Sequence, residues 1–192
     1  NDHITSLGGQ IYSHLQFTTA IVKVDGCFYT TVCGGNKISN FLFMRSKDGE
    51  VWTHVSLVEH MVNYEAMLAY HDNKFWVMCR NGYEVVTSEK QQNLLYSADG
   101  IHWKQSTISL ETSDTRPYLF TYQGDLYLAY SSPLPNEYST VRPWRCNIHV
   151  GKIVTQKDIQ IFTLKHLEKK KYLQIIGITV LSINCKLFVI IY

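Results

Sequence analysis

One phrase recurs four times along the chain and limits the folds that this chain can adopt. Each copy holds an apolar stretch, a polar turn with Gly or Asn, and a second stretch rich in aromatic residues. The copies occupy residues 20–29, 66–76, 118–127 and 179–188. The first apolar residues after each turn are Phe28, Phe75, Leu126 and Leu187, which lie 47, 51 and 61 residues apart. Each phrase predicts a β-hairpin, and the regular spacing predicts a repeat architecture.

A second phrase, Ser-x-Asp-Gly-x-x-Trp, follows the first two hairpins. It occupies residues 46–52 and 97–103, so that Trp52 and Trp103 lie 51 residues apart. Asp-Gly favours a tight turn, because Gly adopts positive φ without strain and the Asp carboxylate accepts local backbone N–H groups. We therefore interpret these residues as structural rather than catalytic: Ser46, Asp48, Gly49, Trp52, Ser97, Asp99, Gly100 and Trp103.

Together the two phrases predict an all-β chain. Two hairpins in each period give four strands in about 50 residues, which is typical of a β-propeller blade. We expect one β-propeller domain of four-stranded blades, with about four blades in this chain. Their expected ranges are 17–57, 64–108, 115–153 and, for an incomplete fourth blade, 172–192.

Composition excludes several classes of protein. The chain has 192 residues, 45% hydrophobic, and a net charge of +2, so it is neither disordered nor a strongly basic nucleic-acid binder. The five cysteines form no C-x-x-C pair and the eight histidines form no ligand motif, so we expect no metal and no cofactor. The run Lys169–Lys171 is interpreted as a solvated loop.

The last 20 residues, 173–192, are mostly apolar and follow three lysines, as a membrane span could. They also contain Gln174, Asn184 and Lys186, and a Lys within a span costs about 3 kcal/mol. We therefore expect two strands around a turn and no membrane span. The chain starts at Asn1 without a signal-peptide pattern, so we expect a secretion signal to be either absent or already removed. The missing initiator Met suggests a mature product or a fragment.

The two Asp-Gly phrases resemble a shortened Asp-box, the bacterial neuraminidase repeat of the sialidase superfamily. The stretch from Glu65 to Arg80 is similar to the sialidase blade that opens with Glu and ends its second strand with Arg. The resemblance covers most of residues 17–192 and only the later blades of that six-bladed family. It implies an exo-α-sialidase that removes terminal sialic acids from glycoconjugates, in an extracellular or periplasmic location.

The resemblance also implies roles for individual residues. Glu65 would polarise a tyrosine nucleophile, and Arg80 would belong to the arginine triad that binds the sialic acid carboxylate. Guanidinium groups suit this task because they form paired, charge-assisted hydrogen bonds, and a Tyr nucleophile avoids repulsion by an anionic substrate. The following blade supplies three candidates for a second arginine, and a later tyrosine is a candidate nucleophile: Arg145, with Arg142 and Arg116 as rivals, and Tyr172.

Three parts of the family site have no clear counterpart in this chain. No arginine precedes Arg45, and the only carboxylates before the first Asp-Gly phrase are Asp2 and Asp25. The expected nucleophile position reads Ile175–Ile178. Missing blades would account for the first two losses, and an unclosed propeller would expose strand edges and favour self-association.

Two other functions stay open at this point. The first is a non-catalytic Asp-box propeller that acts as a glycan-binding or protein-interaction module. The second is a five-bladed glycosidase that cleaves neutral sugars, which would share the phrase Leu126–Tyr130 but would not explain the Asp-boxes.

Overall fold

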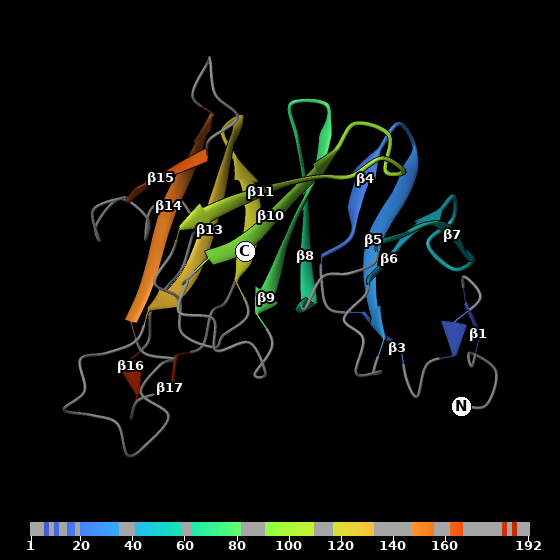
Figure 1. The fold of residues 1–192 in the computed structure, drawn as a ribbon, viewed down its shortest axis with the longest axis horizontal. Helices are drawn as coiled ribbons and strands as arrows, with labels where there is room; N and C mark the ends of the chain where they lie inside the picture. Colours follow the sequence, from blue (N-terminus) through green and yellow to red (C-terminus); the bar gives the residue numbers. More distant parts are fainter. Residues whose placement is uncertain are drawn as a thin grey trace.

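A computed structural model gives the arrangement of the chain (Figure 1). It describes residues 6–7, 10–11, 15–17, 20–34, 41–58, 63–81, 91–109, 117–132, 147–155, 162–166, 182–183 and 186–187. Strands and turns make up these residues, and none of them is helical. The prediction of an all-β chain is therefore confirmed.

The first large sheet takes residues from the N-terminal third of the chain. Its strands are β3 (Leu15–Phe17), β4 (Val22–Val24), β5 (Cys27–Gly34), β6 (Phe41–Ser46) and β7 (Trp52–Val58). The order is β3-β5-β6-β7, with β4 also paired to β5, and every pairing is antiparallel.

The second and third sheets each have four antiparallel strands in sequence order. The second contains β8 (Asn63–His71), β9 (Lys74–Asn81), β10 (Gln91–Ser97) and β11 (Lys104–Ser109). The third contains β12 (Tyr118–Tyr122), β13 (Asp125–Ser132), β14 (Asn147–Thr155) and β15 (Phe162–His166). The last of these strands lies beyond residue 153, where the sequence pattern ended the third unit.

Two short strand pairs lie near the chain ends. They are β1 (Ser6–Leu7) with β2 (Gln10–Ile11), and β16 (Ser182–Ile183) with β17 (Lys186–Leu187). The second pair encloses residues 184–185, where the sequence predicted a turn between two strands.

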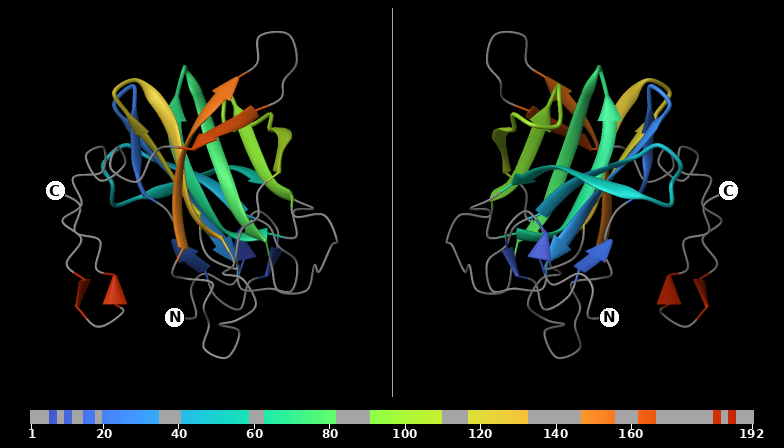
Figure 2. Two further views of the ribbon diagram at one scale, coloured as in Figure 1. Left: turned by 90° about the vertical axis from the view of Figure 1, so that its left-hand side faces the viewer. Right: turned by 90° about the vertical axis from the view of Figure 1, so that its right-hand side faces the viewer.

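Tight turns join the first two strands of each large sheet. Their central residues have positive φ at both positions: Asp25 and Gly26, Asp72 and Asn73, Gln123 and Gly124. Positive φ at both positions defines the type I′ turn, whose twist matches that of the flanking strands. The predicted hairpins at 20–29, 66–76 and 118–127 are thus confirmed. Figure 2 shows their three turns at the same end of the molecule, which we call the turn end.

The core lies between neighbouring sheets. Alternate side chains of adjacent strands face the next sheet, as the two-residue period of a strand requires. Between the first and second sheets they include Phe43, Ala66, Leu68, Phe75 and Val77. Between the second and third sheets they include Met67, Trp76, Met78, Leu119 and Leu128. Strand β8 is an edge strand of the second sheet. It contacts β5 of the first sheet and β12 of the third, and because it lies between the other two sheets we call it the innermost strand.

Candidate functional site

Glu65 lies in a β-bulge in strand β8. Tyr64 pairs with Arg80 and Met67 pairs with Met78, so that two residues of β8 face a single residue of β9. Glu65 has φ +58°, the left-handed value that Gly usually supplies at the first position of such a bulge. Left-handed backbone in a residue other than Gly costs about 1–3 kcal/mol, and outside tight turns such strain is typical of functional sites.

Side chains of the first sheet hold this bulge in place. The carbonyl of Ala66, which lies in the bulge, accepts a 2.8 Å hydrogen bond from Thr31 Oγ1. The Ala66 N–H donates to Cys33 Sγ at 3.4 Å. Thr31 and Ala66 are fully buried, and a buried backbone group without a partner would be costly. The first sheet therefore fixes the backbone that presents Glu65, which is half-buried.

Arg80 occupies the same end of the second sheet as Glu65. It lies on β9 opposite Tyr64, the residue that precedes Glu65. The structure describes the backbone of Arg80 but not its side chain. The other predicted site residues lie outside the described residues: Arg116, Arg142, Arg145 and Tyr172. Of the predicted catalytic and substrate-binding residues, the backbone thus places two on adjacent strands, and the grouping of the rest stays a prediction.

The two Asp-Gly turns form the same set of local hydrogen bonds. In the first, Asp48 Oδ1 accepts bonds of 2.9 Å from the N–H groups of Glu50 and Val51, and Ser46 Oγ accepts a 2.8 Å bond from Gly49 N–H. The Trp52 indole donates to the Gly49 carbonyl at 3.1 Å. The second turn repeats these bonds with Ser97, Asp99, Gly100, Ile101, His102 and Trp103.

These hydrogen bonds favour the ionised form of both aspartates. The N–H groups of Val51 and Glu50 and the hydroxyl of Ser46 lower the pKa of Asp48. The His102 ring, 2.7 Å from Asp99 Oδ2, is the main cause that lowers the pKa of Asp99, followed by the backbone N–H groups of His102 and Ile101. Both carboxylates therefore accept hydrogen bonds within their own turns, which fits a structural role.

The second Asp-Gly turn also attaches the second sheet to the first. Ser56 Oγ donates to the Gly100 carbonyl at 2.6 Å and accepts from the Trp103 indole at 3.1 Å. The ring of Trp103 packs edge-on against Phe43, with centroids 5.3 Å apart. Phe43 and Ser56 are directly opposite on β6 and β7. The second Asp-Gly turn therefore helps to fix the position of the second sheet relative to the first. The contact between these two sheets also supports the bulge at Glu65.

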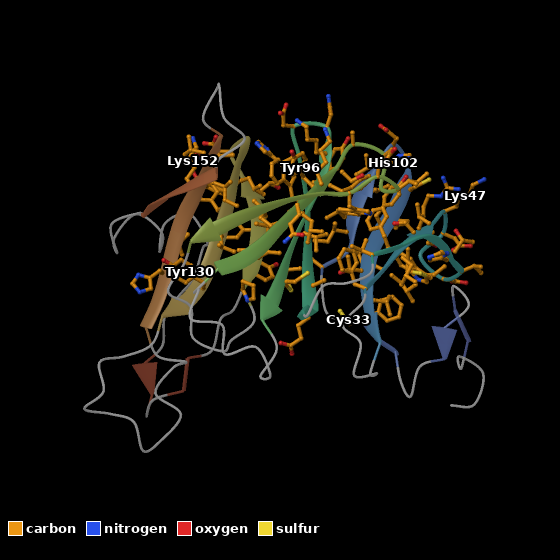
Figure 3. All side chains as sticks on the ribbon, viewed as in Figure 1. Cys33, Lys47, Tyr96, His102, Tyr130 and Lys152 are labelled. Carbon is orange, nitrogen blue, oxygen red and sulfur yellow. The ribbon has the colours of Figure 1, made fainter. Side chains whose placement is uncertain are left out.

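Two buried thiols lie in the core beside the bulge. Cys33 on β5 and Cys79 on β9 are free cysteines of the same buried cluster. Complete burial raises the pKa of Cys79 well above its usual value, and the neighbouring Cys33 adds to this effect. The Cys79 thiol is consequently protonated at neutral pH. Cys33 Sγ accepts the hydrogen bond from the Ala66 N–H in the bulge. Figure 3 shows Cys33 towards the opposite end of the molecule from His102, which lies in the second Asp-Gly turn.

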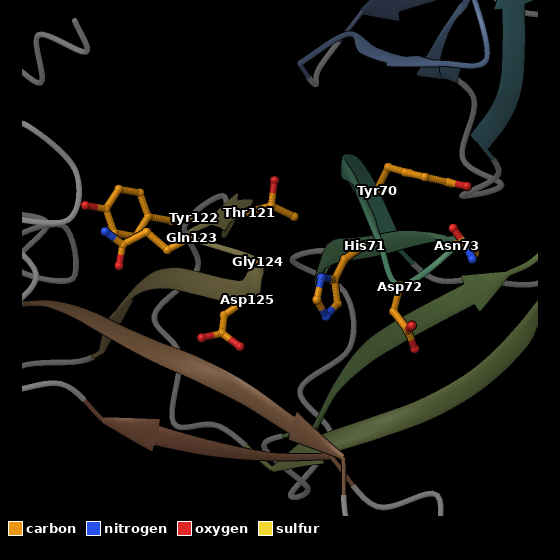
Figure 4. Close-up of a pocket in the computed structure, with 9 residues that line it drawn as sticks. All are labelled: Tyr70, His71, Asp72, Asn73, Thr121, Tyr122, Gln123, Gly124 and Asp125. Atoms are coloured by element: carbon orange, nitrogen blue, oxygen red, sulfur yellow. The ribbon is translucent and has the colours of Figure 1, made fainter.

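A pocket opens at the turn end, far from Glu65. It is formed by the β8–β9 and β12–β13 turns and is lined by residues 70–73 and 121–125 (Figure 4). None of the residues predicted for the site lines it. The chemistry of this pocket is therefore separate from that of the Glu65 and Arg80 edge.

Comparison with solved structures decides the architecture. A sialidase of Trypanosoma rangeli superposes with a TM-score of 0.56 at 15% identity, over 77% of this chain and 25% of that chain. A xylan β-1,4-xylosidase of Bacillus halodurans gives 0.56 at 15% identity, over 78% and 30%. An α-L-arabinofuranosidase of Clostridium thermocellum gives 0.54 at 13% identity, over 77% and 52%. The chain is a partial β-propeller.

The structural neighbours of this partial propeller are glycoside hydrolases with propeller folds. At these identities the likeness shows the fold alone. The chain spans between about a quarter and a half of the length of the three enzymes. No protein-family model matches the chain, and no curated protein sequence matches it.

Sequence reasoning missed the residues that support the bulge. Thr31 and Cys33 look like ordinary interior residues of a strand, and their alternate spacing on one face of β5 is the only signal that they share a neighbour. Among the described residues there is no group of three or more His, Cys, Asp or Glu that could hold a metal ion. The described part of the chain also has no helix with the length and hydropathy that a membrane span needs.

Proposed function

We propose that this propeller forms part of a sialidase-like glycoside hydrolase that acts on terminal sialic acids of glycoconjugates. The observation that supports it most is the bulge at Glu65. A carboxylate residue occupies a left-handed position on the innermost strand, next to the cross-strand pair of Tyr64 and Arg80. The strained backbone at Glu65 reduces stability, and a functional role for a carboxylate at this end of the sheet would account for that cost.

The residues of this edge would divide the chemistry between them. Arg80 would bind the sugar carboxylate through two parallel N–H···O bonds, which a planar guanidinium provides and an ammonium does not. Glu65 would accept the proton of a tyrosine hydroxyl, so that the phenolate oxygen attacks the anomeric carbon while the glycosidic bond breaks and its electron pair leaves with the aglycone oxygen. Water would then hydrolyse the glycosyl–tyrosine bond and release the sialic acid. Tyr172 is the proposed nucleophile, and Arg145, with Arg142 and Arg116 as alternatives, would add a second guanidinium. The two Asp-Gly turns, as shortened Asp-boxes, would belong to the scaffold.

The alternative is a non-catalytic module that binds a glycan or a protein partner. The sequence supports it at one point, because no arginine precedes Arg45 and the family's first arginine therefore has no counterpart in this chain. In that case the Arg80 edge would bind an acidic sugar without cleaving it.

A fluorogenic α-sialoside separates the two functions. We expect the full chain to release the fluorophore, and Glu65→Gln to abolish release because an amide cannot accept the proton. Glu50→Gln, the same change in the exposed first Asp-Gly turn, should leave release unaffected. Binding of the sialoside without release by the folded chain would favour the glycan-binding module. The absence of binding would contradict both the hydrolase and a module that binds acidic sugars.

A further inference from the structure

The pocket at the turn end has the size of a small-ligand site. Its volume is about 600 Å³, within the usual range of roughly 300–1,000 Å³ for such sites. It lies between the second and third sheets, at the opposite end of β8 from Glu65. His71 lies six positions after Glu65 on β8, which corresponds to about 20 Å. A ligand in this pocket would not reach the Glu65 edge.

The walls of the pocket are firmly positioned. Each wall is a type I′ turn, with φ of +49° and +52° at Asp72 and Asn73 and of +48° and +80° at Gln123 and Gly124. The Tyr70 ring packs on Phe75 at a centroid distance of 5.0 Å. The Trp76 indole donates to the His71 carbonyl at 3.0 Å. A ligand would therefore meet groups that are already in place, which reduces the entropy cost of binding.

The lining is polar on both sides. Figure 4 shows His71, Asp72 and Asp125 directed to one side of the two turns, whereas Tyr70 and Tyr122 extend away from one another and Thr121 points to the other side. Asn73, Thr121 and Gln123 add amide and hydroxyl groups that can both donate and accept hydrogen bonds. Such mixed donors and acceptors match a ligand with many hydroxyl groups better than an apolar one.

The charges of the pocket disfavour an anion. The described lining residues include two carboxylates, of Asp72 and Asp125, and no Lys or Arg. Lys74 and Lys152 lie outside the lining and pair with these carboxylates, at 3.3 Å and 2.6 Å respectively. The hydrogen bond to Asp125 raises the pKa of Lys152, so the Lys152 ammonium stays charged at neutral pH. With each carboxylate balanced by one lysine, the pocket suits an uncharged ligand.

We propose that this pocket is a second binding site, separate from the Glu65 edge, and that it takes a neutral saccharide unit. The proposal does not depend on the activity proposed for Glu65 and Arg80. A site on the opposite end of the propeller would hold a neutral part of a glycan, or of a second glycan chain, while the Glu65 edge stays open.

The test is an NMR titration of the full ¹⁵N-labelled chain with D-xylose, D-galactose and N-acetylneuraminic acid in turn. We expect a neutral sugar to shift the amide signals of both turns, including Asn73 and Gly124, and the acidic sugar to leave these signals in place. His71→Ala should weaken neutral-sugar binding at least fivefold, because it removes a central side chain and keeps the backbone carbonyl that holds Trp76. His54→Ala, the same change at an exposed residue of β7, should leave the affinity for the neutral sugar unchanged.

Three results would overturn the proposal. The first is that neither neutral sugar shifts the amide signals of the two turns. The second is that only the acidic sugar shifts them. The third is that the wild type and His71→Ala bind the neutral sugar with equal affinity. Shifts confined to the Glu65 end of β8 would also contradict it, while supporting the proposed function of that end. The two ideas can therefore fail independently.

Discussion

Thr31 donates a 2.8 Å hydrogen bond to the carbonyl of Ala66, 35 residues further along the chain, and both residues are completely buried. This bond joins the first sheet to the second at the one point where the ladder between β8 and β9 is interrupted. It supplies a buried donor to the Ala66 carbonyl, and Cys33 Sγ accepts a hydrogen bond from the Ala66 N–H. The conformation of Glu65 is thus set by a neighbouring sheet.

Thr31→Val should reduce the free energy of unfolding by about 1–3 kcal/mol, because it removes a buried hydrogen bond from the Thr31 hydroxyl to the Ala66 carbonyl. The matched control is Thr30→Val on the same strand. Thr30 is equally buried, and its hydroxyl has no hydrogen-bond partner among the described residues. We expect the control to be neutral or stabilising in urea unfolding. Equal losses in the two variants would show that the bond to Ala66 contributes nothing specific.

Glu65→Gly should stabilise the chain relative to Glu65→Ala by about 1 kcal/mol, since Gly adopts the left-handed conformation without strain. The φ of +58° at Glu65 is the basis of this expectation. Thermal unfolding of the two variants, which both lack the carboxylate, isolates the backbone effect. If the alanine variant is the more stable one, the bulge does not have the described conformation.

Gly100→Ala should destabilise the chain more than Gly49→Ala. Both glycines have positive φ, +73° and +85°, so each substitution costs about 1–2 kcal/mol of backbone strain. A Cβ at Gly100 would also lie within contact distance of the Phe43 ring, whereas at Gly49 it meets nothing within 4 Å. Overpacking adds about 1–3 kcal/mol to the first variant only. Denaturant unfolding of the pair measures the contact between the second turn and the first sheet.

Acid should weaken the fold through the two Asp-Gly turns. The folded-state pKa values of Asp48 and Asp99 are lowered by hydrogen bonds, so the stabilisation is present above the unfolded value of about 3.9 and is lost as the pH falls towards the folded values. We expect Asp99→Asn to flatten the loss of stability below about pH 4. Glu50→Gln is the control and should keep the wild-type slope. An unchanged slope in Asp99→Asn would show that the turn does not favour the carboxylate.

Local chemistry explains which parts of the fold could be predicted. The pair Asp25-Gly26 carries its turn signal within two residues, and the spacing of Trp52 and Trp103 is visible in the sequence alone. Strand β15 was missed because its sequence, FTLKH, offers too short an alternation to distinguish it from a loop. The bulge was missed because its stability depends on bonds from Thr31 and Cys33, whose partner is set by how two sheets pack.

The candidate site likewise has parts that could be predicted from the sequence and parts that could not. Glu65 and Arg80 could be placed together because a single hairpin joins them and they lie only 15 positions apart in the sequence. The pocket at the turn end depends on the separation between two sheets, which neither turn sequence encodes. Arg145 and Tyr172 are candidates from the family resemblance, and their positions stay predictions.

The most direct test of the Glu65 and Arg80 edge is isothermal titration of the folded, monodisperse chain with N-acetylneuraminic acid and with its analogue lacking the carboxylate. We predict that the chain binds the acid and not the analogue. Arg80→Lys should abolish binding of the acid, because an ammonium cannot form the two-point contact. The control Arg45→Lys changes an exposed arginine near the turn end and should bind the acid as the wild type does. Equal binding of the two sugars, or no binding by the folded wild type, would contradict the account.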